Sequence, residues 1–220
     1  MPSYIKLCMK TWKKKYTLLT FNNLNQYTSL PIRRIKDFTL PQISDIIRVH
    51  VLRDNGGYWM DADTIMISDK LPIETMVGVP GTRAHHCGQL HTDKNNPMFI
   101  AWADYQDKII NSNNTPTYWG TFVNSFTDEY VKNHLEISIK DRTCYFPELY
   151  MVKGDMQNCD KYIEFYFKKS YHLSDLRPAD ILMLHNSWTP DWYKKLNSDE
   201  VLKTNCTMSN ILKEVLECSE

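Results

Sequence analysis

The hydrophobic positions of this chain switch between helical and extended spacing from one segment to the next, which is typical of an α/β protein. Over residues 4–14, apolar side chains recur every three or four positions and predict a helix with one buried face. Residues 16–21 (YTLLTF) form a short apolar run that predicts a buried strand. Similar runs at residues 76–79 and 181–184 predict two more short strands.

The remaining segments continue this alternation. Pro97 stands at the first position of an amphipathic stretch, where a helix tolerates proline. Helical spacing returns at residues 115–130 and 190–220. Aromatic-rich runs at residues 144–152 and 162–167 predict further strands.

The most distinct helix is predicted at residues 44–55. Ser44 or Asp45 can cap its amino end, and Asp45 and Arg48 lie three positions apart on one side of its first turn. The sequence Asp54-Asn55-Gly56-Gly57 supplies glycines that end a helix and turn the chain. One face is predicted to be buried, through Ile46, Ile47, His50, Val51 and Leu52.

Two carboxylates follow that turn, one residue apart. Asp61 and Asp63 flank Ala62, directly after Tyr58-Trp59-Met60. In an extended segment, side chains two positions apart point to the same face, so both carboxylates can converge on one divalent cation. Magnesium and manganese prefer oxygen ligands and keep room for substrate phosphates. An isolated Asp-x-Asp is nonetheless common by chance, and its simplest interpretation is a solvated strand end.

The surrounding sequence is more specific. Ser44-Asp45-Ile46-Ile47-Arg48, followed by Gly56-Gly57-Tyr58-Trp59-Met60-Asp61-Ala62-Asp63, resembles the core of the DXD glycosyltransferases. It is similar to the form shared by the initiating mannosyltransferase-like family, the capsular polysaccharide synthesis proteins and the glucosylating domain of clostridial toxins. The resemblance implies a single GT-A domain over residues 1–220, with a mostly parallel central sheet flanked by helices. These families carry one more strand before the first helix, and this sequence begins at or just after that point.

The resemblance also implies roles for the polar residues. Asp63 would bind Mn²⁺ or Mg²⁺ directly, and Asp61 would share the metal or hold the ribose hydroxyls. Asp45 and Arg48 would hydrogen-bond the hydroxyls of the transferred sugar. The donor pocket is expected to include Ser44, Asp45, Arg48, Tyr58, Trp59 and Asp61.

A second candidate segment, His185-Asn186-Ser187-Trp188, follows the apolar run at residues 181–184. A lone histidine after a strand is usually structural. In the resembling families, however, a carboxy-terminal His or Asn followed by Ser-Trp or Ser-x-Trp lies on a loop that closes over the donor. By this resemblance, the polar atom of His185 or Asn186 would be the third protein contact to the metal or the diphosphate. We expect His185 to bind the metal and Asn186 to bind the donor. Ser187 and Trp188 would contact the leaving phosphate.

The composition of the chain argues against several classes of protein. At 220 residues with 42% hydrophobic content, the chain is long enough for a sizeable core. Its formal net charge of zero argues against a general nucleic-acid binder. No segment approaches the roughly 20 apolar residues of a membrane span, and the amino end does not match a secretory signal. Six cysteines without a C-x-x-C pair are typical of reduced thiols, so we expect a cytoplasmic protein.

The predicted function is a metal-dependent glycosyltransferase that moves a hexose-type sugar from a nucleotide-diphosphate donor, UDP before GDP, to a glycan or other hydroxyl acceptor. Retention of configuration is expected, as in the resembling families. One alternative is a haloacid-dehalogenase-like phosphatase with Asp61 as nucleophile, although Asp45 and Arg48 would then have no role. The other is a non-catalytic nucleotide-sugar-binding module. A zinc site at His85-His86-Cys87 and His91 matches no established spacing.

Overall fold

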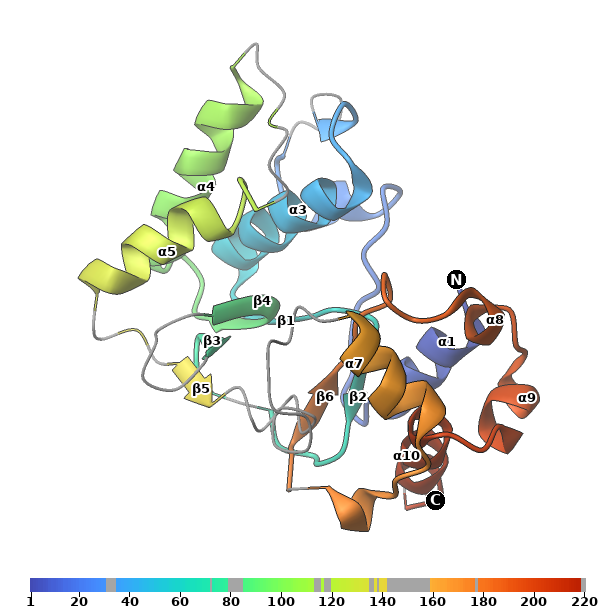
Figure 1. The fold of residues 1–220 in the computed structure, drawn as a ribbon. Coiled ribbons are helices and arrows are strands. Elements are labelled where there is room, and N and C mark those ends of the chain that lie inside the picture. Colours follow the sequence, from blue (N-terminus) through green and yellow to red (C-terminus); the bar gives the residue numbers. More distant parts are fainter. Residues whose placement is uncertain are drawn as a thin grey trace. The chain divides into compact units, whose positions relative to one another are not determined.

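The computed structural model describes residues 1–30, 35–71, 73–78, 85–112, 116, 120–134, 137, 139–141, 159–176 and 178–218. These residues form a mixed α/β fold, as predicted (Figure 1). Its α-helices are α1 (Ser3–Lys10), α3 (Leu40–Asn55), α4 (Pro97–Ile110), α5 (Asn124–Asn133), α7 (Cys159–Ile163), α8 (Asp191–Lys194), α9 (Ser198–Lys203) and α10 (Thr207–Glu217). Its strands are β1 (Gly57–Met60), β2 (Thr64–Met66), β3 (Met76–Gly78), β4 (His85–Thr92), β5 (Ile139–Asp141) and β6 (Ile181–Met183).

The strands form two small sheets, one in the order β1-β4-β3-β5 and one made of β2 and β6. The pairs β2–β6 and β3–β4 are antiparallel. Only six residues separate β3 from β4, and a parallel crossover needs a dozen or more. The mostly parallel central sheet expected from the sequence is therefore not shown by these two pairs.

The chain divides into two compact units, each made of segments that are distant in sequence. Unit 1 contains Met1–Lys15, Met60–Pro72 and Asp141–Glu220. Unit 2 contains Tyr16–Trp59 and Ile73–Lys140. Each unit has its own buried apolar side chains.

In unit 1, α1 packs against β2, α9 and α10 (Figure 1). Two side chains at the end of the helix bind the strand. Trp12 donates through Nε1 to the carbonyl oxygen of Thr64 at 2.8 Å, and the hydroxyl of Thr11 accepts from the amide of Met66 at 2.8 Å. Strand β2 pairs with β6 through Ile65 opposite Leu182, so α1 is bound directly to the sheet of its unit.

The aromatic run at residues 162–167 is helical, and the predicted strand there is wrong. Helix α7 continues into a π-helical turn, η3 (Glu164–Lys168). Tyr162, Phe165 and Tyr166 are all buried in the core of unit 1. Their spacing of three and four residues fits one helix face, whereas the prediction weighed only the β propensity of aromatic residues.

In unit 2, α3 packs against α4 and β4. The helix begins four residues earlier than predicted, because Thr39 and Gln42 form a capping box. It ends at Gly56, as expected. That glycine has φ 69°, and a β-carbon there would lie 2.5 Å from the amide nitrogen of Lys94. The predicted helix at Pro97 is also confirmed, with the side chain of Asn96 accepting from the amide of Met98.

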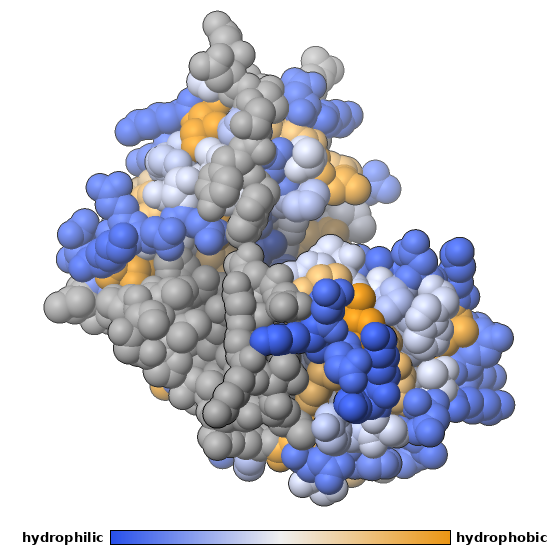
Figure 2. Space-filling view, in the orientation of Figure 1, coloured by the Kyte–Doolittle hydropathy of each residue, from blue (hydrophilic) through white to orange (hydrophobic). Residues whose placement is uncertain are grey.

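The strand predicted at residues 16–21 is wrong. This segment has no regular structure, and Tyr16, Leu18 and Phe21 are each 44–49% exposed. The predicted strand at residues 144–152 lies outside the described residues. On the face shown in Figure 2, the described surface is mostly hydrophilic, with small separate hydrophobic patches.

His50 makes the stability of unit 2 depend on pH. This α3 side chain is 1% exposed, and its Nε2 lies 3.7 Å from Asp107 Oδ1 on α4. Burial, with a smaller contribution from Arg53, lowers the pKa of His50 to about 4. Between pH 4 and 6.5 the unfolded chain therefore binds the extra proton, and the free energy of unfolding rises with pH.

As the pH falls from 6.5 to 4, we expect the protonation of His50 to lower the free energy of unfolding by up to about 3 kcal/mol. Denaturant unfolding of the wild type and of His50→Leu across this range measures the effect. The difference between the two curves should grow as the solution is acidified. A difference that is constant with pH would contradict the role of His50 in this pH dependence.

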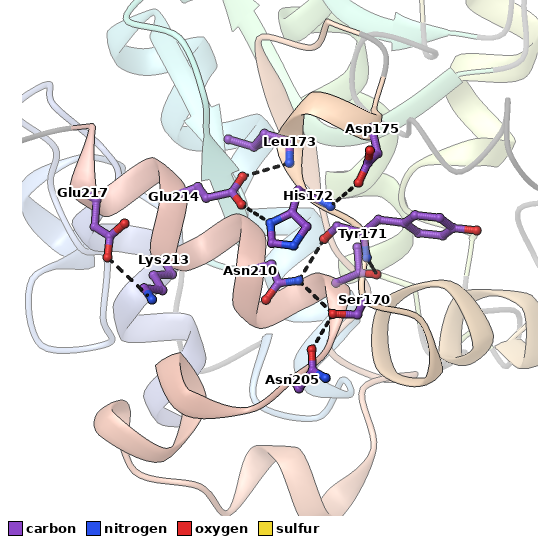
Figure 3. A network of polar contacts seen from close by, with 11 residues as sticks. Ser170, Tyr171, His172, Leu173, Asp175, Asn205, Asn210, Lys213, Glu214 and Glu217 are labelled. Carbon is purple, nitrogen blue, oxygen red and sulfur yellow. Dashed lines mark hydrogen bonds and ion pairs between the residues drawn. The ribbon is translucent and has the colours of Figure 1, made fainter.

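A polar network joins residues 170–175 to α10 in unit 1 (Figure 3). Glu214 accepts from the amide of Leu173 at 2.8 Å and also contacts the imidazole Nδ1 of His172. Asn210 donates to the carbonyl oxygen of Tyr171 at 3.2 Å. Glu214 is therefore the carboxylate through which α10 holds this segment.

The variant Glu214→Ala is expected to lower the free energy of unfolding by about 1–2 kcal/mol, since two hydrogen bonds to a carboxylate are lost. Glu217→Ala is the matched control on the same helix (Figure 3), because Glu217 pairs only loosely with Lys213, at 3.9 Å. That change should cost about 0.5 kcal/mol or less. Equal melting temperatures for the two variants would refute the assignment.

Candidate functional site

Asp61 and Asp63 lie in the turn between β1 and β2. The strand that was expected to present them ends at Met60, so the alternation of side chains along a strand does not apply to this pair. Both residues are half-buried. Asp61 and Asp63 therefore follow the strand in a turn, and not in the extended segment that was predicted.

Asp63 is bound to the second candidate segment. Its carbonyl oxygen accepts from the amide of Leu184 at 3.1 Å, which extends the pairing of β2 with β6. Its carboxylate oxygen Oδ2 accepts from the backbone amide of Asn186 at 2.9 Å. The structure thus brings together two motifs that are 123 residues apart.

The segment after β6 is held by buried hydroxyl groups. The amide of His185 donates to the phenol oxygen of Tyr162 at 3.1 Å, and the hydroxyl of Thr189 donates to the carbonyl oxygen of His185 at 3.1 Å. The His185 ring packs against Trp188, with ring centroids 4.1 Å apart. Asn186 and Ser187 are exposed at the tip of this turn.

Tyr4 on α1 reaches the same turn and was missed at the sequence level. Its phenol donates to Asn186 Oδ1 at 2.6 Å. Burial raises the pKa of Tyr4 and of Tyr162, so both phenols keep their protons at neutral pH. The helical spacing predicted α1, but no local signal connects Tyr4 with a residue 182 positions away.

In unit 2, the structure brings together Ser44, Asp45, Arg48 and Trp59. The guanidinium of Arg48 forms an ion pair with Asp45 at 3.1 Å and a hydrogen bond with the hydroxyl of Ser44 at 3.1 Å. It also donates to the carbonyl oxygen of Cys87 on β4. Arg48 is 6% exposed, whereas the side chain of Asp45 is 18% exposed. Arg48 therefore fixes the position of Asp45 and joins α3 to β4.

The two aromatic residues predicted for the donor pocket lie on opposite faces of β1. The ring centroid of Trp59 is 5.3 Å from the guanidinium carbon of Arg48. Tyr58 stacks on His91 of β4 at 4.1 Å and is 40% exposed. Successive strand residues point to opposite faces, so only Trp59 lies beside Arg48. The predicted aromatic pair Tyr118-Trp119 lies outside the described residues.

The carboxylates of the turn suit a hard divalent cation. Asp61 and Asp63 supply oxygen ligands, and Mg²⁺ is typically held by one or two carboxylates together with water and substrate phosphates. Within the part of the chain that the structure describes, no three His, Cys, Asp or Glu side chains are grouped as a metal site. The third ligand, His185, and the metal itself stay predictions.

The comparisons with known proteins bear on the family of the chain. None of the helices in the described part of the chain has the length and hydrophobicity needed to cross a bilayer. No curated protein and no solved structure matches the chain. A family model described as capsular polysaccharide synthesis protein matches residues 1–205, which include both candidate motifs. The chain belongs to the capsular polysaccharide synthesis protein family.

Proposed function

We propose that this protein is a metal-dependent glycosyltransferase of the GT-A type, built as one domain. It moves a hexose-type sugar from a nucleotide-diphosphate donor, with UDP favoured, to a glycan or other hydroxyl acceptor. The observation that carries the proposal is the hydrogen bond between the carboxylate of Asp63 and the amide of Asn186, in a member of a polysaccharide synthesis family.

One group of residues is proposed to bind the diphosphate end of the donor. Asp61 and Asp63 would hold Mn²⁺ or Mg²⁺, and His185 would complete the protein ligands. The cation, when bound, neutralises the charge of the departing nucleoside diphosphate. Ser187 and Trp188 would donate hydrogen bonds to the phosphate from which the sugar departs. The exposure of Ser187 at the tip of its turn supports this assignment.

A second group of residues is proposed to bind the transferred sugar. Asp45 would accept hydrogen bonds from hydroxyl groups of the transferred sugar, since its carboxylate is more exposed than Arg48. Arg48 and Ser44 would keep that carboxylate in position, because Arg48 contacts both. Trp59, beside Arg48, or Tyr58, on the opposite face of β1, would line the donor pocket.

The transition state of the transfer has oxocarbenium character, as in other glycosyl transfers. The carboxylate of Asp45 would stabilise positive charge that develops on the sugar ring. We propose that the configuration at the anomeric carbon is retained. The turn at residues 185–188 would cover the donor and exclude water, which limits hydrolysis.

A thermal-shift screen of UDP-, GDP- and dTDP-sugars, each with and without Mn²⁺, tests the proposal. We expect one nucleotide class to raise the melting temperature only when Mn²⁺ is present, and slow release of free sugar from that donor. Binding without hydrolysis or transfer would identify a binding module instead. A trapped aspartyl-phosphate on Asp61 would identify a phosphatase. Either of these results would end the proposal.

A further inference from the structure

The direction of each hydrogen bond around residues 185–189 can be assigned from the chemistry of the groups. A backbone amide can only donate, so the His185 amide uses an oxygen lone pair of Tyr162. A carbonyl can only accept, so the proton of the Thr189 hydroxyl goes to the carbonyl oxygen of His185. The Tyr162 proton is then directed to the Thr189 oxygen, 3.4 Å away.

The proton of Tyr4 has two acceptors within reach, and the oxygen of Asn186 is the closer one. Asn186 Oδ1 is 2.6 Å from the Tyr4 phenol, and the Thr189 oxygen is 3.4 Å away. Tyr4 is 0% exposed and belongs to the core of unit 1. The rigid phenol therefore fixes which end of the Asn186 amide points toward the core.

This orientation decides what Asn186 presents to a ligand. Its oxygen is directed at Tyr4, so its NH₂ group lies at the other end of the exposed side chain. Its backbone amide is bound to the carboxylate of Asp63. An NH₂ group is a hydrogen-bond donor, and phosphate oxygens are strong acceptors.

We propose that Tyr4 is a positioning residue that turns Asn186 so that its NH₂ group donates to an oxygen of the donor's diphosphate. The inference rests on the proposed function and deepens it, because it assigns Asn186 to the phosphate and not to the metal. The rival assignment uses Asn186 Oδ1 as a metal ligand, and the two differ in which atom of one side chain does the binding.

Tyr4→Phe removes the hydroxyl group of Tyr4 and keeps its aromatic ring. Tyr193→Phe is its matched control: Tyr193 is also 0% exposed, its ring centroid is 5.7 Å from that of Tyr4, and it bonds Ser209 at 2.9 Å, away from the turn. We expect both variants to lose similar thermal stability. Only Tyr4→Phe should weaken binding of UDP in the presence of Mn²⁺, by about 3- to 10-fold in Kd.

Asn186→Asp separates the two assignments and lies on the surface, so folding is not at risk. Its carboxylate can still accept from Tyr4 but cannot donate. We expect Kd for UDP with Mn²⁺ to rise about 10- to 100-fold, and binding of Mn²⁺ alone to be at least as strong as in the wild type. The KM for the sugar donor should rise in parallel.

Calorimetric titrations with Mn²⁺ alone, and with UDP plus Mn²⁺, give these values. Equal UDP affinity in Tyr4→Phe and Tyr193→Phe would overturn the positioning role. Unchanged or tighter UDP binding by Asn186→Asp would overturn the phosphate assignment in favour of the metal. A wild-type protein that binds none of the nucleotide diphosphates would instead refute the proposed function. If Tyr4→Phe does not fold, Asn186→Asp alone decides the assignment.

Discussion

Asp63→Asn is expected to reduce metal-dependent sugar transfer by about a thousandfold, because a neutral amide holds a divalent cation far more weakly than a carboxylate and the cation supplies several kcal/mol. The fold should persist. The carbonyl oxygen of Asp63 still accepts from Leu184, and an asparagine oxygen can still accept from the amide of Asn186. Initial transfer rates at saturating Mn²⁺, together with the melting temperature, measure the two effects.

Asp69→Asn provides the matched control for this variant. Asp69 is also in unit 1, but its side chain is 61% exposed and, among the described residues, forms an ion pair with Lys13 at 3.2 Å. Its replacement should leave both the rate and the dependence on Mn²⁺ unchanged. Full activity in Asp63→Asn would show that the DXD carboxylates do not hold the cation.

Arg48→Met should lower the free energy of unfolding by about 3–5 kcal/mol, as is typical when one partner of a buried ion pair is removed. The loss has two sources. The partly buried carboxylate of Asp45 loses the guanidinium of Arg48, and the carbonyl oxygen of Cys87 loses one donor. Chemical denaturation gives the magnitude, and the double variant Asp45→Asn/Arg48→Met should recover part of it.

Arg53→Met is the control on the same helix. Arg53 pairs with Asp54 at 2.7 Å, but the two side chains are 20% and 29% exposed. Breaking this more exposed pair should cost about 1 kcal/mol or less. If the two arginine variants were equally stable, Arg48 would not be the link between α3 and β4.

Sequence patterns predicted those helices and strands that are determined by residues close together in the sequence. The spacing of apolar residues and the glycine turn located most of α3, and a four-residue apolar run located β6. The three-residue separation of Asp45 and Arg48 placed them on one side of a helix, and the structure shows them there as an ion pair. The start of α3 was missed although Thr39 and Gln42 carry the capping signature, because Ser44 and Asp45 offered a second plausible cap.

The errors arose where packing outweighed local preference. Residues 162–167 are rich in aromatic side chains, which favour strands. In the structure these residues are helical and pack in the core of unit 1. Residues 16–21 look apolar, but no neighbouring strand pairs with them among the described residues, and they remain exposed. The DXD carboxylates were assigned to a strand because their sequence continues from one.

The candidate site was predictable only as two separate motifs. The contact of Asp63 with Asn186 joins positions 123 residues apart, and Tyr4 reaches Asn186 across 182 residues. Residues so far apart in sequence share no periodic pattern that would predict their contact. The resemblance to a family implied that both motifs serve one donor site, but the two hydrogen bonds themselves are seen only in the structure.

The order of segments in unit 1 constrains how this protein can form on a ribosome. Helix α1 is translated before α9 and α10, against which it packs. Part of its apolar face can therefore be covered only after α9 and α10 have left the exit tunnel, whereas most of the partners of unit 2 have emerged by residue 140. A nascent chain stalled before α9 would leave that part of α1 without its helical partners.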